Sequence, residues 1–276
     1  MRGLILAAGR GSRMGALGDD RPKCMVELNG RPLLDRQIAA LRRGGVSEIG
    51  IVRGYRAEIL NFPGLSYFDN PRWSQTNMVM SLTAAASWLR AGPVIVSYAD
   101  IFYRADVVRA LAHQPGALVI SFDRLWRKLW SRRFADPLSD AETFKINGAG
   151  ELLEIGGRTQ TIEDIEGQYM GLLKFTPAGW NAVEQILAAL DAPSRDRLDM
   201  TGLLRRLLAA KSIVISTVGT DGEWGEIDNP GDVELYQSMI RDGELTLEAP
   251  FGADELRRGP LQNRESNSTT SERRIS

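Results

Sequence analysis

Short apolar runs along the chain alternate with longer segments in which apolar residues recur every three or four positions. Continuous apolar runs are typical of strands buried in a sheet, and the longer periodicity is typical of helices that pack on it. The predicted strands span 4–8, 48–52, 65–68, 93–100, 117–122, 169–175 and 212–217. The predicted helices span 33–41, 77–90, 106–112, 177–190, 199–210 and 231–241. This alternation predicts an α/β fold with a mostly parallel central sheet.

Residues 123–170 interrupt the alternation. They are rich in charged and aromatic residues, are broken at Pro137, and contain only short strand-like pieces at 143–146 and 151–155. We interpret this segment as an elaboration that packs over one end of the sheet.

The C-terminal part of the chain has a different composition. We expect one domain over residues 1–245 and a tail over 246–276. From residue 260 the chain reads PLQNRESNSTTSERRIS, with one Leu and one Ile among 17 residues. Such a segment buries too little apolar area to offset the entropy cost of ordering it, so disorder is predicted from about residue 260.

Composition narrows the functional classes. Of the 276 residues, 43% are hydrophobic and 25% are charged, and the formal net charge is −1. Because no strong overall charge attracts nucleic acid or anionic lipid, we expect neither nucleic acid nor membrane as a partner. The single Cys24 and single His113 exclude an intramolecular disulfide and a zinc site built from Cys and His. His113 falls at a predicted helix end, where a cation suits the helix dipole, and is expected at the surface.

The N-terminal residues give an expectation for localisation. The start, MRGLILAAG, lacks the charged and apolar regions of a signal peptide, and no apolar stretch approaches the roughly 18 residues of a membrane span. We therefore expect a cytoplasmic protein.

A cationic, glycine-rich loop follows the first predicted strand, in the stretch LILAAGRGSRMGALGDDRPKCMVEL at 4–28. Glycines let backbone N–H groups approach an anion closely, and Arg13 and Lys23 add charge for a polyphosphate. The spacing does not match the Rossmann fingerprint, and no helix is expected to start within the loop. A Walker A loop is also excluded, because Lys23 follows Pro22 and precedes Cys24. The remaining alternative is a mobile surface loop that is basic by chance.

The stretch LAAGRGSRMG, followed by RPKCMVELNGRPLLDRQI, closely resembles the signature of nucleotidyltransferases, which join a nucleoside triphosphate to a phosphorylated acceptor. The segments TNMVMSL (76–82), VSYAD (96–100), YMGLLKF (169–175) and GEWGEIDNPGDVELY (222–236) are similar to the phosphocholine-cytidylyltransferase branch. The segment LWRKLWSRRFADPLSDAETFKI also resembles cytidylyltransferases for phosphonates and phosphoglutamine-type acceptors. The resemblance covers roughly residues 1–242 and implies a three-layer sandwich of the nucleotide-diphospho-sugar transferase (GT-A/Rossmann-like) fold.

Two carboxylates are candidate metal ligands. Asp100 ends a predicted strand, and Asp228 follows an extended segment; alone, each would be read as a turn or cap residue. The resemblance places both at the family's metal-ligand positions, and Mg²⁺ prefers carboxylates together with phosphates and waters. It also implies catalytic roles for Arg13 and Lys23.

The implied chemistry is consistent with the near-absence of His and Cys. An acceptor oxygen that is already anionic can attack the α-phosphorus in line, with pyrophosphate leaving, so no protein nucleophile is required. The expected substrates are CTP and a small phosphate or phosphonate acceptor, which would be phosphocholine-, aminoethylphosphonate- or phosphoglutamine-like.

The expected binding residues fall into two groups. The nucleotide-binding candidates are Leu6, Ala7, Ala8, Gly9, Gly11, Ser12, Asn77 and Ser81. The acceptor-binding candidates are Trp126, Trp130, Tyr169 and Glu226. Asn77 could instead cap the helix that follows it, and the two tryptophans, four residues apart, could instead form a packing face. The basic residues at 127, 128, 132 and 133 suit either a solvated helix face or an acidic acceptor, and make choline itself a poor fit.

Three other functions remain open at this point. A sugar-1-phosphate nucleotidyltransferase would use UTP, GTP or dTTP, and would differ in its acceptor pocket. A non-catalytic nucleotide-binding regulator would not need all four charged candidates, which are Arg13, Lys23, Asp100 and Asp228. A glycosyltransferase of related fold would carry a D-x-D motif, which SYADIFY at 97–103 lacks.

Overall fold

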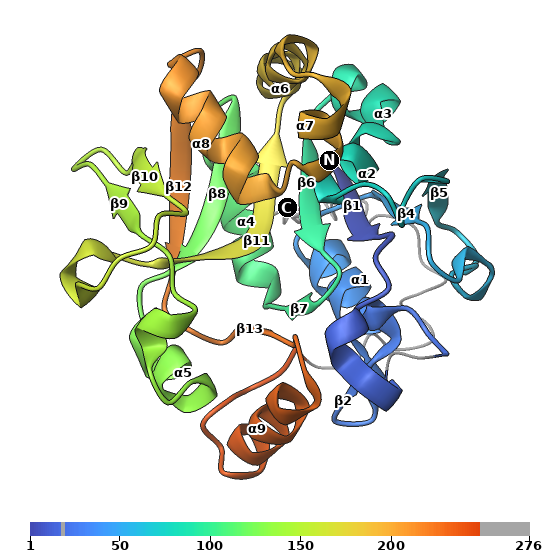
Figure 1. The fold of residues 1–276 in the computed structure, drawn as a ribbon. Coiled ribbons are helices and arrows are strands. Elements are labelled where there is room, and N and C mark those ends of the chain that lie inside the picture. The colour runs from blue at the N-terminus through green and yellow to red at the C-terminus, as the bar shows by residue number, and fades with distance from the viewer. Residues whose placement is uncertain (18–19, 249–276) are drawn as a thin grey trace, which may run out of the picture.

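A seven-stranded sheet runs through the computed structural model, which describes residues 1–17 and 20–248 (Figure 1). The order of the strands across the sheet is β12-β8-β11-β6-β1-β4-β5. They are β1 (Arg2–Ala7), β4 (Glu48–Arg53), β5 (Ser66–Asp69), β6 (Val94–Tyr98), β8 (Leu118–Asp123), β11 (Gln168–Phe175) and β12 (Ile215–Thr220). Strand β11 is antiparallel to β6 and β8, and the other pairs are parallel. The predicted α/β fold with a mostly parallel sheet is confirmed.

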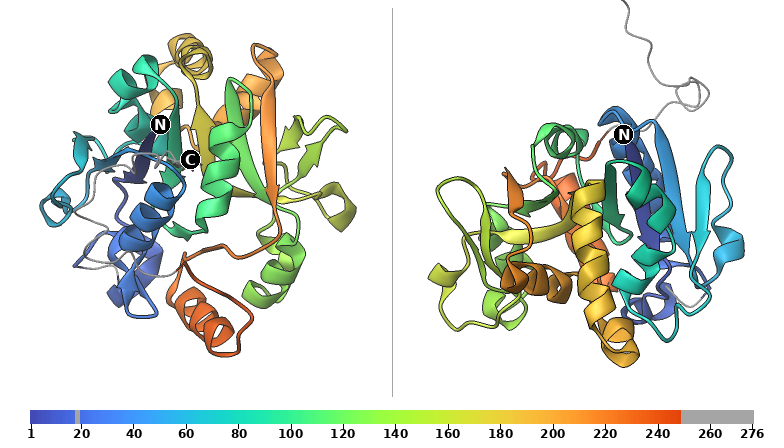
Figure 2. Two further views of the ribbon diagram at one scale, coloured as in Figure 1. Left: turned by 180° about the vertical axis from the view of Figure 1, so that it is seen from behind. Right: turned by 90° about the horizontal axis from the view of Figure 1, so that it is seen from above.

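Helices cover both faces of this sheet and make the three layers. One face carries α1 (Leu33–Arg43) and α4 (Ala105–His113), seen from behind in Figure 2. The other face carries α2 (Met78–Thr83), α3 (Ala86–Ala91), α6 (Pro177–Ala189) and α8 (Met200–Ala210), with α7 (Ala192–Arg197) beside α2. Each layer has its own core, because alternate residues of a strand point to opposite faces: Ile5 packs in one core and Leu4 in the other. Burial on both faces explains why the strands read as continuous apolar runs.

Local geometry departs from the predicted elements in three places. The expected single helix over 77–90 is two short helices, α2 and α3. The Thr83 hydroxyl donates to the Met80 carbonyl, a local bond that competes with helix continuation where α2 ends. Residues Ser12–Leu17 form a 3₁₀ helix kinked at Gly15, in a loop where no helix was expected. Helix α7 was not predicted; Asp191 caps it by accepting from the Ser194 backbone N–H.

The elaboration over 123–170 contains α5 (Trp126–Arg133) and a separate antiparallel pair, β9 (Phe144–Ile146) and β10 (Leu152–Ile155). Helix α5 faces the last helix, α9 (Pro230–Arg241), below the sheet in Figure 1. Two further short pairs are β2 (Glu27–Leu28) with β3 (Arg31–Pro32), and β7 (Ile101–Phe102) with β13 (Gly225–Glu226). Helix α5 therefore lies near the sheet end where β6 leads into Asp100, whereas β9 and β10 lie beside β12 and α8 (Figure 1).

Packing continues past the expected domain boundary at residue 245. The Glu248 carboxylate accepts from the Ala105 backbone N–H at 2.7 Å and pairs with Arg43 at 3.2 Å. Residues 249–276, including the segment predicted to be disordered, lie outside the described residues. In the parts of the chain that the structure does describe, no helix combines the length and apolar character needed to cross a membrane.

Strand β11 is irregular next to Tyr98, a residue that lines the cavity described below. The pairing of β11 with β8 shifts between Tyr169 and Leu173, and Gly171 lies there with φ +75°. A Cβ at Gly171 would stand 2.6 Å from Cδ2 of Tyr98. Only glycine meets both demands, the left-handed backbone and the close approach to the ring.

We predict that Gly171→Ala lowers the free energy of unfolding by about 1–3 kcal/mol more than Gly64→Ala. Gly64 has the same φ of +75°, but a Cβ there would meet nothing within 4 Å, so it reports backbone strain alone. Urea unfolding of both variants measures the difference. Equal losses would show that Tyr98 yields to the added methyl group without cost.

Candidate active site

Three carboxylates from distant parts of the chain converge at the end of β6. Asp100 follows β6, Glu226 belongs to β13, and Asp228 lies two residues further; one oxygen of each lies within 4.8 Å of the others. Pairing of β7 with β13 brings the segments together, and the Ile227 backbone N–H donates to the Asp100 carbonyl at 2.9 Å. The structure thus places the two predicted metal ligands side by side.

Gln37 of α1 stabilises the turn that carries Asp100. The buried Gln37 amide donates to the carbonyls of Tyr98 and Ile101, which flank the Asp100 turn. Buried carbonyls are costly without a donor, so Gln37 fixes the backbone that presents Asp100.

Lys23 and Arg13 of the glycine-rich loop meet these carboxylates. Lys23 Nζ lies 2.7 Å from Asp100 Oδ2 and 2.8 Å from Asp228 Oδ1, and Arg13 Nη2 lies 2.8 Å from the same Asp228 oxygen. Burial alone would lower the pKa of Lys23, but attraction to Asp100 and Asp228 raises that pKa overall, so the ammonium stays charged. Burial also opposes ionisation of Asp228, but Lys23, Arg13 and Arg133 lower the pKa of Asp228 overall.

A close packing contact sets the position of Lys23. Gly11 has φ +71°, and a Cβ there would lie 2.8 Å from the Cβ of Lys23. The glycine therefore lets the loop backbone lie directly against the Lys23 stem. Pro22 precedes the short 3₁₀ helix Lys23–Met25, which directs the side chain inward, where 11% of its surface is exposed.

The carboxylates at this point repel one another. Burial, together with repulsion from Asp100 and Asp228, raises the pKa of Glu226 to about 8. Asp100 Oδ1 is buried and has no hydrogen-bond partner among the described residues. A set of carboxylate oxygens with one free buried acceptor is the donor chemistry that Mg²⁺ prefers, so the residues fit a divalent cation.

Arg133, at the end of α5, closes the site from the acceptor-side elaboration. Its guanidinium binds both oxygens of Asp232, at 3.0 and 3.2 Å, and reaches Asp228 Oδ2 at 3.4 Å and Glu226 Oε2 at 3.6 Å. The side chain is 1% exposed and lies over the Trp130 ring. Asp232 in turn accepts from the Asp228 backbone N–H at 2.8 Å. Arg133 thus fixes both the carboxylate and the backbone of Asp228.

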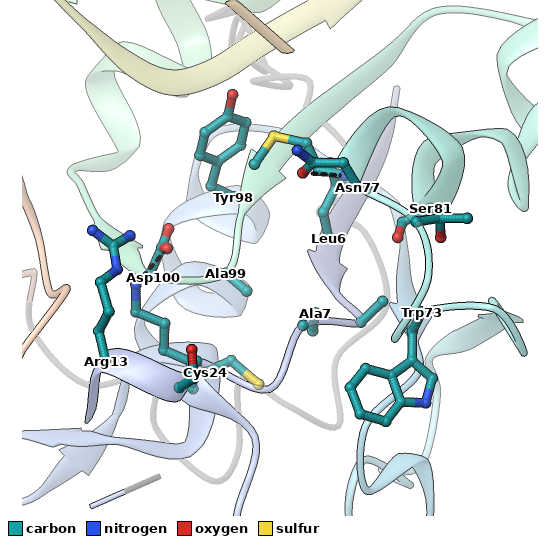
Figure 3. A pocket seen from close by; sticks show the side chains of 17 residues that line it. Leu6, Ala7, Arg13, Cys24, Trp73, Asn77, Ser81, Tyr98, Ala99 and Asp100 are labelled. Atoms are coloured by element: carbon teal, nitrogen blue, oxygen red, sulfur yellow. Dashed lines mark hydrogen bonds and ion pairs between the residues drawn. The ribbon is translucent and has the colours of Figure 1, made fainter. Parts of the chain in front are cut away.

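A cavity of about 290 Å³ opens beside the carboxylates (Figure 3). Every predicted nucleotide-binding residue lines it, as do Arg13, Lys23 and Asp100: the predicted set is Leu6, Ala7, Ala8, Gly9, Gly11, Ser12, Asn77 and Ser81. Figure 3 shows Arg13 and Asp100 on one side of the cavity, with Trp73 and Ser81 on the other. The charged groups therefore stand on one side of a cavity lined by both polar and apolar residues.

Asn77 and Ser81 have structural partners as well as cavity positions. The Asn77 side chain caps α2 by accepting from the Met78 backbone N–H at 2.7 Å, and it donates to the Arg197 carbonyl at 3.3 Å. The alternative interpretation of Asn77 as a helix cap is therefore observed. Ser81 Oγ accepts from Asn70 Nδ2 at 3.0 Å, which leaves its own hydroxyl hydrogen available for another acceptor.

Two acceptor candidates require correction. Trp126 and Trp130 are 4% and 1% exposed, and their indole N–H groups donate to the Ile165 carbonyl and to Asp140. They form the core beneath α5, so their faces cannot hold an acceptor. The third candidate, Tyr169, packs edge-to-face on Tyr98, and the two ring centroids are 5.9 Å apart. Glu226 lies with the carboxylate cluster.

Sequence reasoning missed Arg133, Asp232 and Trp73 as functional positions. Arg133 was considered only within a basic run, where helical spacing gives no sign that one member turns inward. Asp232 had a detectable signal: it lies three residues after Asn229, the spacing of a capping box, which the structure shows at the start of α9. Trp73 lines the cavity from a turn that has no periodic pattern.

The chain matches known proteins in sequence. Residues 3–162 match the family model described as the MobA-like NTP transferase domain. The CTP:phosphoglutamine cytidylyltransferase of Campylobacter jejuni is 36% identical over 254 residues, which cover 85% of this chain and 98% of that protein. The 2-aminoethylphosphonate cytidylyltransferase of Lancefieldella rimae is 32% identical over 55% of this chain and 59% of its own length.

Solved structures share the fold at lower identity. The inositol-1-phosphate CTP transferase of T. maritima superposes with a TM-score of 0.66 at 18% identity, over 88% of this chain and 96% of that one. The CTP:phosphocholine cytidylyltransferase of Streptococcus pneumoniae gives a TM-score of 0.65 at 19% identity, over 87% and 98%. These likenesses confirm the three-layer nucleotidyltransferase fold.

We predict that Arg133→Met lowers the free energy of unfolding by about 3–5 kcal/mol, because it leaves Asp232 buried without its partner. Arg132→Met is the matched control on the same helix. Arg132 pairs at 2.6 Å with Glu244, and both side chains are 36% exposed, so its loss should stay below about 1 kcal/mol. Urea unfolding measures both variants. Similar losses would show that Asp232 finds another partner.

Proposed function

Because the chain belongs to the nucleotidyltransferases that carry the MobA-like NTP transferase domain, we propose that it transfers CMP from CTP to a small phosphate or phosphonate acceptor, with release of pyrophosphate. The observation that carries the proposal is the position of Lys23, Arg13 and Asp100 at one end of the cavity that the glycine-rich loop lines. A triphosphate placed there meets cations and carboxylates together. The choice of CTP rests on the names of the relatives.

Each group has a role in that geometry. The glycine-rich loop presents backbone N–H groups to the phosphates, and Lys23 and Arg13 offset the negative charge that develops on the departing pyrophosphate. Asp100 and Asp228 would hold Mg²⁺, which neutralises phosphate charge when it is bound. The base would lie at the far end, against backbone groups of Leu6–Gly9 and the Ser81 hydroxyl. Gln37 and Arg133 keep the two carboxylates oriented.

The acceptor enters from the side of α5 and α9. Its phosphate or phosphonate oxygen is already anionic, so the reaction needs alignment with the α-phosphorus rather than a general base. Glu226 and Tyr169 remain the proposed acceptor contacts. Because Trp126 and Trp130 are buried, no tryptophan cage at these positions surrounds a quaternary ammonium. We therefore propose a phosphoglutamine- or aminoethylphosphonate-like acceptor in preference to phosphocholine.

The alternatives are separated by one panel experiment. Pyrophosphate release is measured with CTP, UTP, GTP and dTTP, each against phosphoglutamine, 2-aminoethylphosphonate, phosphocholine and glucose 1-phosphate. We expect release with CTP and one of the first two acceptors. Release only with glucose 1-phosphate and another triphosphate would identify a sugar nucleotidyltransferase. Nucleotide binding without release on any acceptor would favour a regulator.

The metal assignment gives a second prediction. Asp100→Asn and Asp228→Asn keep the side-chain shape but remove the charge, so each should reduce pyrophosphate release at least about 100-fold. The double variant should be little worse than either single one, because residues that act as a unit are not additive. Asp221→Asn is the control, since Asp221 is 67% exposed and pairs only with the surface residue Arg124 in the described contacts.

Two outcomes would contradict the shared role of these carboxylates. One is full additivity of the two substitutions in the double variant. The other is activity that persists in excess chelator.

A further inference from the structure

Lys23 occupies the place between the two carboxylates that the proposed metal ion would need. Its ammonium bridges Asp100 Oδ2 and Asp228 Oδ1 at 2.7 and 2.8 Å. An ion bound about 2.1 Å from both of these oxygens can lie on either side of the line that joins them. In every such position it would be within about 4 Å of Lys23 Nζ. Two cations at that separation repel strongly in a partly buried site. A divalent ion that bridges Asp100 and Asp228 through these two oxygens therefore competes with the ammonium for them.

The Lys23 ammonium has a second set of possible partners, the phosphate oxygens of a nucleotide in the cavity. Lys23 lines the cavity of the glycine-rich loop together with Arg13 and Ser12, where phosphate oxygens would lie. Its stem is held against Gly11, so the outer end of the side chain is the part that can turn between carboxylate and phosphate. Arg13 differs, because its side chain is 71% exposed and its guanidinium contacts Asp228 but not Asp100 in the described contacts.

We propose that Lys23 is a built-in counter-ion that a divalent cation must displace, and that the displaced ammonium then turns to the phosphates of the nucleotide. This inference rests on the proposed function, because it takes the cavity as the triphosphate site. Its consequence is coupled binding. The metal alone binds weakly, since it must break two charge-assisted contacts, whereas metal and triphosphate together give the ammonium new partners. Lys23 thus disfavours occupation of the site by metal without nucleotide.

The test measures metal binding without nucleotide or turnover. Mn²⁺ binding is followed by electron paramagnetic resonance in the wild-type protein, Lys23→Met, Lys23→Gln and Arg13→Gln. We expect Lys23→Met to bind Mn²⁺ at least about 10-fold tighter than the wild type, because the internal competitor is gone. Mn²⁺ should also raise the melting temperature of Lys23→Met more than that of the wild type.

The control separates displacement from a simple loss of positive charge. Arg13→Gln also removes one cation from Asp228 Oδ1, but it leaves the Lys23 bridge between Asp100 and Asp228 in place, so its gain in Mn²⁺ affinity should be clearly smaller than that of Lys23→Met. Lys23→Gln is the second variant, which decides the test if Lys23→Met does not fold. Folded Lys23 variants with unchanged or weaker Mn²⁺ affinity would overturn the inference, as would an equal gain in Arg13→Gln.

Failure of the inference and failure of the proposed function can be told apart. If the Lys23 variants gain Mn²⁺ affinity but the wild type releases no pyrophosphate from any triphosphate, the counter-ion role stands and the proposed reaction does not. If the wild type turns over CTP while the Lys23 variants gain no Mn²⁺ affinity, the reaction stands and displacement is excluded.

Discussion

Repulsion among the carboxylates of Asp100, Glu226 and Asp228 is the constraint on which the rest of this site depends. Carboxylates within 4.8 Å of one another are tolerated in a partly buried place when cations offset their charge or when one of them takes up a proton, as the raised pKa of Glu226 indicates. The chain supplies those cations from two separate segments, the glycine-rich loop with Arg13 and Lys23 and helix α5 with Arg133. The complete set of charges therefore combines two segments that are more than 100 residues apart in the sequence.

The two oxygens of Asp228 divide the site into halves. Oδ1 faces Lys23 and Arg13 on the proposed nucleotide side, and Oδ2 faces Arg133 on the proposed acceptor side. One carboxylate thus stands at the boundary between the cavity and the elaboration. This position suits a group that must be aligned with both reactants at once.

Features fixed by short-range pattern could be predicted from the sequence. The strands were recognisable because burial on both faces makes them continuously apolar, and Asp100 could be placed because it ends such a strand. The glycine-rich loop carries Arg13 and Lys23 ten positions apart, and the resemblance of the motif around them to nucleotidyltransferases indicated their roles. The predicted nucleotide-binding residues all line one cavity, although Asn77 and Ser81 are more than 50 positions from Lys23 of the glycine-rich loop.

Features that depend on distant partners could not be predicted. Arg133 turns inward because Asp232, 99 residues away, accepts its guanidinium. Trp126 and Trp130 are core residues because Asp140, the Ile165 carbonyl and Trp224 surround them, whereas their four-residue spacing suits packing and binding equally. The break between α2 and α3 depends on a side-chain hydrogen bond that apolar periodicity does not report.

The buried Gln37 amide has a consequence for how such a protein can diversify. It anchors the Asp100 turn to α1, within the same compact unit as the glycine-rich loop. Glu226 and Arg133, by contrast, come from β13 and α5, which pack outside the seven-stranded sheet. The glycine-rich loop and the Asp100 turn are thereby attached to the central sheet and its helices, whereas Glu226, Asp228 and Arg133 come from segments outside that sheet. Substitutions in α5 therefore change the surroundings of Asp228 and Glu226 without altering the sequence of the glycine-rich loop or of the Asp100 turn.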